Sequence, residues 1–405
     1  METRAPLQLY RCAGRVFIPA ASVPRATRST AVSIARHRLR ILAACAALAA
    51  LPACDGGGGG TEPPAPLAVS ATGRLERGSV LTLAISDGAQ ALSPSQVTVT
   101  FAPAGAAQLQ GDGTVKLLAA GHLTITATLG ERTGKAEVEV AAPPVVVFDK
   151  LVNGNRDIWR VDLDGQNLTQ LTTDPGEDQD PTAVKGNVVF VSYRSGNAEL
   201  YSIPLAGGST TRLTTTARDE TTPSLSLDGT RLAYSYVPTD VTKVFTAAAN
   251  GSGAAQLAPG TGAEVIETAP TWSPGGAVAY VSTAAGSADI VQASVGSAPT
   301  LLTGSPQADV EPAWSPDGQA LAFVSNRGGP VEIWIFRPSG STVTQLTSGT
   351  GSRINPAWTA DGRLVYVEQV GSATQLRWID PAHPAVSTAI DTGAGTVSHP
   401  AVNLP

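Results

Sequence analysis

Cysteine is almost absent from this 405-residue sequence, and none of its three cysteines lies beyond residue 54. Disulfide bonds therefore cannot stabilise the rest of the chain, which must fold by burying an apolar core. Aromatic residues make up only 5% of the chain and charged residues only 15%. Val, Thr, Ser, Ala and Gly predominate instead, a composition that favours strands and tight turns over helices. We expect an all-β protein.

Acidic residues are scarce at the start of the chain and abundant afterwards. Residues 1–53 contain eight arginines and one acid, whereas the remainder has 19 Lys and Arg against 32 Asp and Glu. Because an acidic body repels phosphate backbones, and because no basic stripe is present, we expect no nucleic-acid partner.

The basic head contains an export signal. Arginines at 36, 38 and 40 precede the apolar run 41–53, which is long enough for a signal-peptide core and too short to span a bilayer. The run ends in the letters LPAC, and these resemble the bacterial lipoprotein signal, in which a cysteine after a small residue is lipidated and becomes the new N-terminus. We therefore predict a leader over residues 1–53 and lipidation of Cys54.

Two alternatives to this signal stay open. Cys45 also follows a small residue, although few apolar residues separate it from the last arginine, and Cys54 could be an incidental thiol after a plain secretory signal. The glycine run and the prolines of residues 54–66 predict a flexible tether in either case.

Residues 67–142 alternate apolar and polar side chains with the period of two that a half-buried strand requires. The apolar positions fall into four sets, which are Leu81, Leu83 and Ile85; Val97, Val99 and Phe101; Leu123, Ile125 and Ala127; Val138 and Val140. Strands at this spacing predict a two-sheet sandwich. The stretch 119–140 resembles a bacterial immunoglobulin-like domain, which implies a spacer or a binding module, and we expect a spacer.

Residues 145–405 repeat. Prolines at 181, 223, 270, 312, 356 and 400 begin aligned segments 42 to 47 residues apart, such as PAWSPDGQALAFVS from Pro312. Each unit contains four short strand patterns separated by turns, and a period of this length indicates propeller blades. The first unit lacks its leading strand, and that strand is present at the C-terminus from Pro400. We predict six blades, closed by the C-terminal strand so that the ring has no open edge.

The PAWSPDG, FVSNR and LT patterns resemble those of the TolB-like six-bladed propeller over residues 145–405. The resemblance implies this fold. The resemblance does not imply that this chain acts in the Tol system or binds the Pal lipoprotein. TolB has an α/β domain before its propeller, where this chain has an immunoglobulin-like segment.

The repeat brings charged residues to one face of the predicted ring. Acids stand three residues before four of the blade prolines, whereas the fifth position is Arg353 and the sixth is Val397; three arginines stand in second-to-third strand turns of the same face. The candidate binding face comprises Asp178, Glu220, Glu267, Asp309, Arg353, Arg156, Arg194 and Arg327. Such a face could capture a cation, a basic peptide segment or the N-terminal residues of a partner. Alternatively, each acid bonds its own loop or pairs with a turn arginine, and repetition at equivalent positions favours that alternative.

Few residues suit catalysis. Beyond residue 54 the chain has His122, His383 and His399 and no G-x-S-x-G nucleophile motif, and we place His383 in an exposed turn and His399 in a blade loop. We expect no enzyme, no catalytic residue, no metal and no cofactor.

These patterns together predict a lipid-anchored exported protein of the bacterial cell envelope, in the periplasm or at the outer membrane or surface. We expect a monomer whose propeller binds a protein or peptide through a polar loop face. The alternative is a carbohydrate- or cell-wall-binding module, and a propeller lyase or hydrolase using His399 is the third hypothesis.

Radioactive palmitate tests the anchor. Wild-type chain expressed in bacteria should be labelled and Cys54→Ser should not, because only the cysteine that follows the signal core is acylated. Cys45→Ser is the matched control and should keep the label. An unlabelled wild type would eliminate the anchor, and loss of label in Cys45→Ser alone would move it to the other cysteine.

Overall fold

The computed structural model describes residues 64–405. The predicted leader, Cys54 and nearly all of the predicted tether lie outside this range. Strands make up nearly all of the regular secondary structure of the described chain, which confirms the all-β class. Its one helix, η1, is a single 3₁₀ turn, so no helix of the described residues could span a membrane.

Residues 68–140 form two antiparallel sheets. The elements are β1 (Ala68–Thr72), β2 (Val80–Asp87), β3 (Gln90–Leu92), η1 (Pro94–Gln96), β4 (Thr98–Ala102), β5 (Ala107–Leu109), β6 (Thr114–Leu117), β7 (Gly121–Leu129) and β8 (Arg132–Val140). Strands β1, β2, β6 and β5 form the larger sheet, with β3 beside β2, and β4, β7 and β8 form the other.

One apolar core lies between these two sheets. Leu81 and Ile85 of β2 and Leu123 and Ile125 of β7 are all but inaccessible to solvent, as the period-two pattern predicts. His122 lies inside β7, directly opposite Glu139 of β8, with its Nδ1 2.9 Å from that carboxylate. Two sheets around one core agree with a sandwich, and its immunoglobulin-like kinship stays a prediction.

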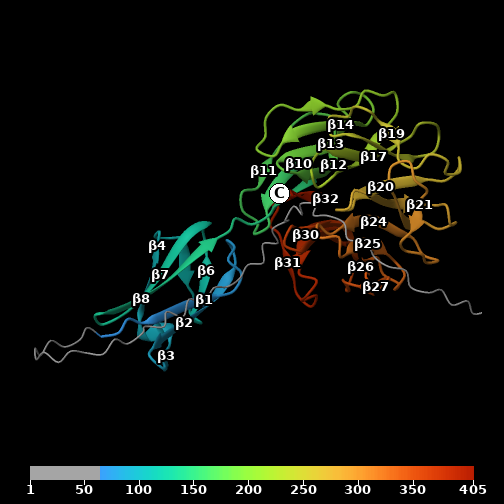
Figure 1. Cartoon of the computed structure of the whole chain (residues 1–405). Helices are drawn as coiled ribbons and strands as arrows, with labels where there is room; N and C mark the ends of the chain where they lie inside the picture. The colour runs from blue at the N-terminus through green and yellow to red at the C-terminus, as the bar shows by residue number, and fades with distance from the viewer. Residues whose placement is uncertain (1–63) are drawn as a thin grey trace, which may run out of the picture. The chain divides into compact units, whose positions relative to one another are not determined.

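Residues 145–402 form six four-stranded antiparallel sheets (Figure 1). The first contains β9 (Val145–Val152), β10 (Asn155–Asp162) and β11 (Thr169–Gln170), together with the last strand, β32 (Thr396–Val402). The second contains β12 (Asp178–Val184), β13 (Asn187–Ser192), β14 (Glu199–Pro204) and β15 (Thr211–Arg212), and the third β16 (Glu220–Leu225), β17 (Arg231–Tyr236), β18 (Lys243–Ala248) and β19 (Ala255–Gln256).

The other three sheets follow the same order. The fourth contains β20 (Glu267–Trp272), β21 (Val278–Ser282), β22 (Asp289–Ala293) and β23 (Thr300–Leu301), and the fifth β24 (Asp309–Trp314), β25 (Leu321–Ser325), β26 (Glu332–Arg337) and β27 (Thr342–Gln345). The sixth contains β28 (Ser352–Trp358), β29 (Leu364–Val370), β30 (Ala373–Ile379) and β31 (Ser387–Ala389).

The six leading strands, β12, β16, β20, β24, β28 and β32, are called the inner strands below. Each packs against the next, and β32 packs against β12, so they form a closed circle of neighbours. β32 also pairs with β9, from Thr396 opposite Leu151 to Val402 opposite Val146. This is the pairing that the repeat predicts between the C-terminus and the first unit.

Turn and tryptophan side chains join the strands within and between sheets. In the turn after β24, the N–H of Gly318 donates to the carbonyl of Ser315, whose hydroxyl bonds the Asp317 carboxylate. Trp272 donates its indole N–H to the carbonyl of Ser224 in the neighbouring sheet, and Trp358 does so to Ala313. These two tryptophans therefore hold adjacent sheets together.

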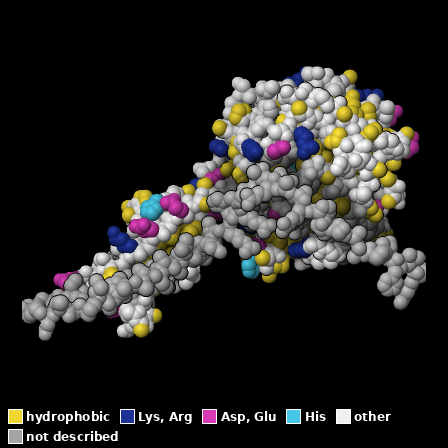
Figure 2. Space-filling model, viewed as in Figure 1, with side chains coloured by type: hydrophobic (Ala, Val, Ile, Leu, Met, Phe, Trp, Pro, Cys, Tyr) yellow, Lys and Arg dark blue, Asp and Glu magenta, His cyan; other side chains and the backbone are white. Residues whose placement is uncertain are grey.

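The view in Figure 2 shows how charge is distributed on one side of the molecule. Lys and Arg side chains are scattered among uncharged atoms and form no continuous basic stripe on this side.

Candidate functional site

The six inner strands surround one pocket of about 260 Å³, here called the axial pocket. Its lining consists of the proline of each inner strand and the residue directly before that proline. The residues before the prolines are Asp180, Thr222, Ala269, Glu311, Asn355 and His399. One position of the repeat therefore supplies the whole pocket.

The prolines explain why these residues lie on the axis. Proline has no N–H to donate to the neighbouring strand, so the ladder cannot continue through it. The register with the second strand shifts at this point in every inner strand, for example between Gln179 and Thr182 in β12. All six residues before the prolines have positive φ, between 42° and 52°. This kink re-aims one side chain per strand, as bulges do beside functional sites.

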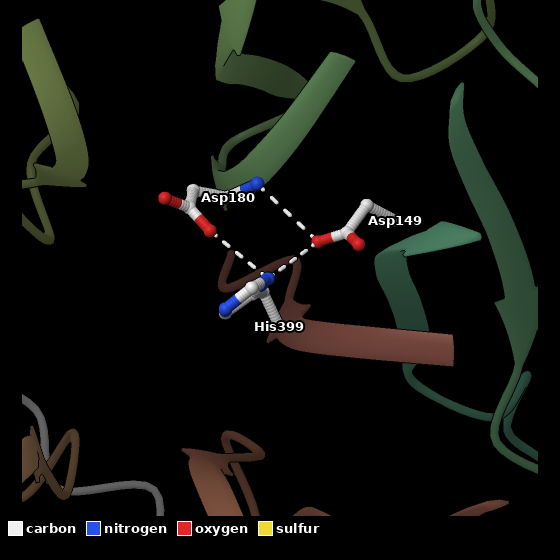
Figure 3. A group of neighbouring side chains, drawn as sticks. All are labelled: Asp149, Asp180 and His399. Atoms are coloured by element: carbon white, nitrogen blue, oxygen red, sulfur yellow. Dashed lines mark hydrogen bonds and ion pairs between the residues drawn. The ribbon is translucent and has the colours of Figure 1, made fainter. Parts of the chain in front are cut away.

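Three of the charged side chains at the pocket form a network (Figure 3). The Nδ1 atom of His399 lies 2.7 Å from Oδ1 of Asp149 in β9 and 2.9 Å from Oδ1 of Asp180 in β12. Arg156 donates to the other oxygen of Asp149 and to the hydroxyl of Ser398. The network joins the last strand to two strands near the start of the repeat.

The network fixes the protonation states. Burial lowers the pKa of His399, but the hydrogen bonds and charges of Asp149 and Asp180 outweigh it and raise the pKa to about 10. Burial acts to raise the pKa of Asp149, but His399, Arg156 and Ser398 hold it below its ordinary value. The imidazole is thus a cation at neutral pH.

Glu311 has no such partner. Its carboxylate accepts the backbone N–H of Asn355 at 2.6 Å. Burial raises its pKa above the ordinary value; the Asn355 hydrogen bond and the charge of His399 oppose this shift, and the charge of Asp180 adds to it.

Asp149, Asp180 and His399 are also the residues that could hold a metal ion. One ligand atom from each lies within 4.8 Å of the other two. The proton on Nδ1 of His399 would have to leave first, and a pKa of about 10 makes this a penalty of about a thousandfold in affinity at pH 7. The donor set fits a metal in kind, but the imidazolium form opposes one.

The acids of the predicted binding face lie behind the pocket. Asp178, Glu220, Glu267 and Asp309 are the first residues of β12, β16, β20 and β24, and none is accessible to solvent. Arg194 donates to both oxygens of Asp178, and Arg327 pairs with Asp309. At these two positions the structure shows the pairing that the alternative interpretation describes.

The arginines of the predicted face are held in internal ion pairs. Arg353 is buried and contacts the carboxylates of Glu332 at 3.3 Å and Glu368 at 2.8 Å. Arg156 belongs to strand β10 and to the Asp149 network, not to a turn as the sequence suggests. Contact of any of these eight residues with a partner stays a prediction.

Glu220 lacks the arginine that Asp178 and Asp309 have. Position 238, equivalent to Arg194 and Arg327, is a proline. Glu220 instead faces Glu199, and neither residue's Oε2 has a hydrogen-bond partner in residues 64–405. Burial, opposed by the Thr216 hydroxyl and reinforced by Glu199, raises the pKa of Glu220 to about 7.

Sequence reasoning missed most of the axial pocket. His399 was expected in a loop, but it lies within β32 and leaves 42% of its side chain exposed. Asp149, Asp180, Glu311 and Asn355 were not singled out. The sequence does contain a signal for these residues, because each directly precedes a repeat proline and they therefore align. Their residue types differ from unit to unit, so a search for repeated residues does not find them.

A known protein family matches the propeller region of the chain. The family described as TolB beta propeller domain matches residues 144–294 and 261–393. The chain belongs to the TolB beta propeller domain family. No curated protein sequence matches the chain.

Solved structures share the TolB-like fold at low sequence identity. TolB from Acinetobacter baumannii is 16% identical with a TM-score of 0.58, over 71% of this chain and 80% of its own. A chain of a nidogen/laminin complex is 12% identical with a TM-score of 0.52, over 64% and 98%. Hydrazine synthase from Kuenenia stuttgartiensis is 12% identical with a TM-score of 0.54, over 64% and 46%. At these identities the likeness shows the fold alone.

The Glu199–Glu220 pair predicts an unusual pH dependence of stability. A carboxyl whose folded pKa is raised above its unfolded value holds its proton more tightly in the folded state, so stability falls as pH rises from about 4.5 through about 7. Glu220→Gln removes this charge and can donate to Glu199. At pH 8 it should therefore increase the free energy of unfolding by up to about 3 kcal/mol and raise the melting temperature by several degrees. At pH 5 it should change the melting temperature little.

Asp309→Asn is the matched control, because Arg327 already compensates that carboxylate. It should lower the melting temperature at pH 8. Arg212 pairs with Glu199 at 2.7 Å, whereas Glu220 has no such ion pair in the described chain. A Glu220→Gln protein that is less stable than wild type at pH 8 would contradict the raised pKa of Glu220.

Proposed function

We propose that this chain is an exported, lipid-anchored binding protein of the bacterial cell envelope, whose propeller receives a segment of a protein or peptide partner in the axial pocket. The family match supports a TolB-like propeller, and the basic leader with Cys54 supports export and anchoring. The region 67–142 acts as an immunoglobulin-like spacer after a tether over 54–66, and 145–405 acts as a six-bladed propeller in a monomer.

One observation carries the binding role. Positions that build the repeat keep their residue type from unit to unit, as the inner-strand prolines do. The position before the proline instead reads Asp, Thr, Ala, Glu, Asn and His, although all six residues share the same backbone conformation. The six side chains thus share one backbone geometry but differ in chemistry. A symmetric ring needs such differences to bind a ligand that is itself asymmetric.

Backbone strain at this position supports the same conclusion. Asn and Asp tolerate positive φ, but a β-branched residue such as Thr222 adopts it only at a cost of order 1–3 kcal/mol. Strain of this kind persists where the surrounding structure imposes it and clusters at ligand sites.

The network supports binding over catalysis. A general base must accept a proton near neutral pH, whereas His399 already carries one there. No Phe, Tyr or Trp side chain lines the axial pocket in the described chain, so this site lacks the usual stacking platform for a sugar. Non-enzymatic action is accordingly part of the proposal.

Site-directed crosslinking tests the proposed function. The chain has no cysteine beyond residue 54, so a single cysteine can be introduced at Ala269, which lines the pocket, or at Ala255 in the outermost strand β19. With a thiol-attached photocrosslinker in intact cells, Ala269→Cys should give a discrete adduct with an envelope protein, and excess unlabelled wild-type chain should abolish it.

Ala255→Cys is the control of the same chemical change and should give no such adduct. Identical adducts from the two positions, or none from either, would contradict binding at the axial pocket.

A further inference from the structure

The order of the inner strands places two carboxylates on opposite sides of the axial pocket. Around the circle of neighbours the pocket residues follow one another as Asp180, Thr222, Ala269, Glu311, Asn355 and His399. Asp180 and Glu311 stand three positions apart in a circle of six and therefore face each other. Uncharged side chains separate them on one side, and Asn355 and His399 separate them on the other.

The charges of the pocket do not balance when its carboxyl groups are ionised. Asp149 and Asp180 are offset by the two cations of their network, His399 and Arg156. Glu311 is the remaining charge. In the described chain its only hydrogen bond is the one from the Asn355 N–H, and no cation of residues 64–405 forms an ion pair with it; the His399 cation acts on it only from a greater distance.

The size of the pocket restricts its occupant. A volume of about 260 Å³ lies below the usual range of drug-sized ligand pockets, about 300–1,000 Å³, and admits one side chain or one chain end rather than a folded loop.

The arrangement of acceptors selects among cations. A guanidinium is best recognised by one carboxylate that accepts two parallel N–H bonds. Here two carboxylates approach from opposite sides, and one oxygen of each is already engaged, by His399 and by Asn355. An ammonium group, a compact charge whose three donors point in different directions, suits separated single acceptors better.

We propose that the axial pocket binds a primary ammonium group of a protein partner, from a lysine side chain or a free N-terminus, between the carboxylates of Asp180 and Glu311. This inference rests on the proposed function and specifies what the pocket recognises. Lysine and the N-terminus present the same chemistry, so the test must separate them.

Four short peptides separate these sources when titrated against the full chain in detergent, with saturation-transfer NMR as the measurement. The first is Gly-Ser-Gly-Tyr amide with a free amine, the second its acetylated form, and the third and fourth acetylated forms with one added Lys or Arg. The first or the third should bind at low salt, at least tenfold more tightly than the second and the fourth. Equal binding of all four, or tightest binding of the Arg peptide, would overturn the proposal without any variant.

Substitutions at the two carboxylates test where the ammonium group binds. Glu311→Gln keeps an acceptor for the Asn355 N–H and should weaken binding at least tenfold, and Asp180→Asn should do the same. Glu264→Gln, the same change at an exposed loop position, should leave binding unchanged. Unaltered binding in both Glu311→Gln and Asp180→Asn would also overturn the proposal.

The crosslinking experiment keeps the two proposals distinguishable. If the adduct of Ala269→Cys persists at wild-type yield when Glu311→Gln is added, the pocket binds a partner but not through an ammonium group. If no adduct forms from any pocket position, the proposed function itself fails.

Discussion

Each inner strand contains a proline that cannot donate a hydrogen bond to its neighbour, and the rest of the repeat region is organised around that missing bond. The ladder shifts register there, the preceding residue takes a positive φ, and its side chain lines the axial pocket. A local covalent constraint, repeated six times, thus creates one shared site.

The junctions between adjacent sheets are subject to a second constraint, the free-energy cost of burying charged side chains. Asp178 and Asp309 are inaccessible to solvent and are each matched by an arginine two residues beyond the end of the second strand. Where that arginine is absent, as beside Glu220, a carboxyl keeps its proton to a higher pH. The junction between the second and third sheets is therefore sensitive to pH near neutrality.

The sequence supports prediction of the framework better than of the site. Alternation and repeat spacing follow directly from strand geometry, so the all-β class and the pairing of β32 with β9 could be read from the letters. The predicted face was found because Asp and Glu recur at one position, the buried first residue of an inner strand, where Asp178 and Asp309 form ion pairs with arginines.

The axial pocket could not be found in this way. Asp149 lies in β9 and His399 in β32, 250 residues apart, and only closure of the ring brings them to 2.7 Å. The pocket side chains differ in type at an aligned position. The positive φ that directs them into the pocket cannot be predicted from residue composition. The periodicity of the sequence predicts neither which distant residues ring closure brings together nor the local backbone geometry.

Because the His399 network exists only when the last strand joins the first sheet, the ionisation of this one ring reports the whole arrangement. The direct measurement is the ¹⁵N chemical shifts of the His399 imidazole as a function of pH in the full chain. We expect both ring nitrogens to stay protonated through pH 8 and to titrate near pH 10. Titration near the ordinary value of about 6.5 would show that Asp149 and Asp180 do not enclose the ring, and would contradict the axial pocket as described.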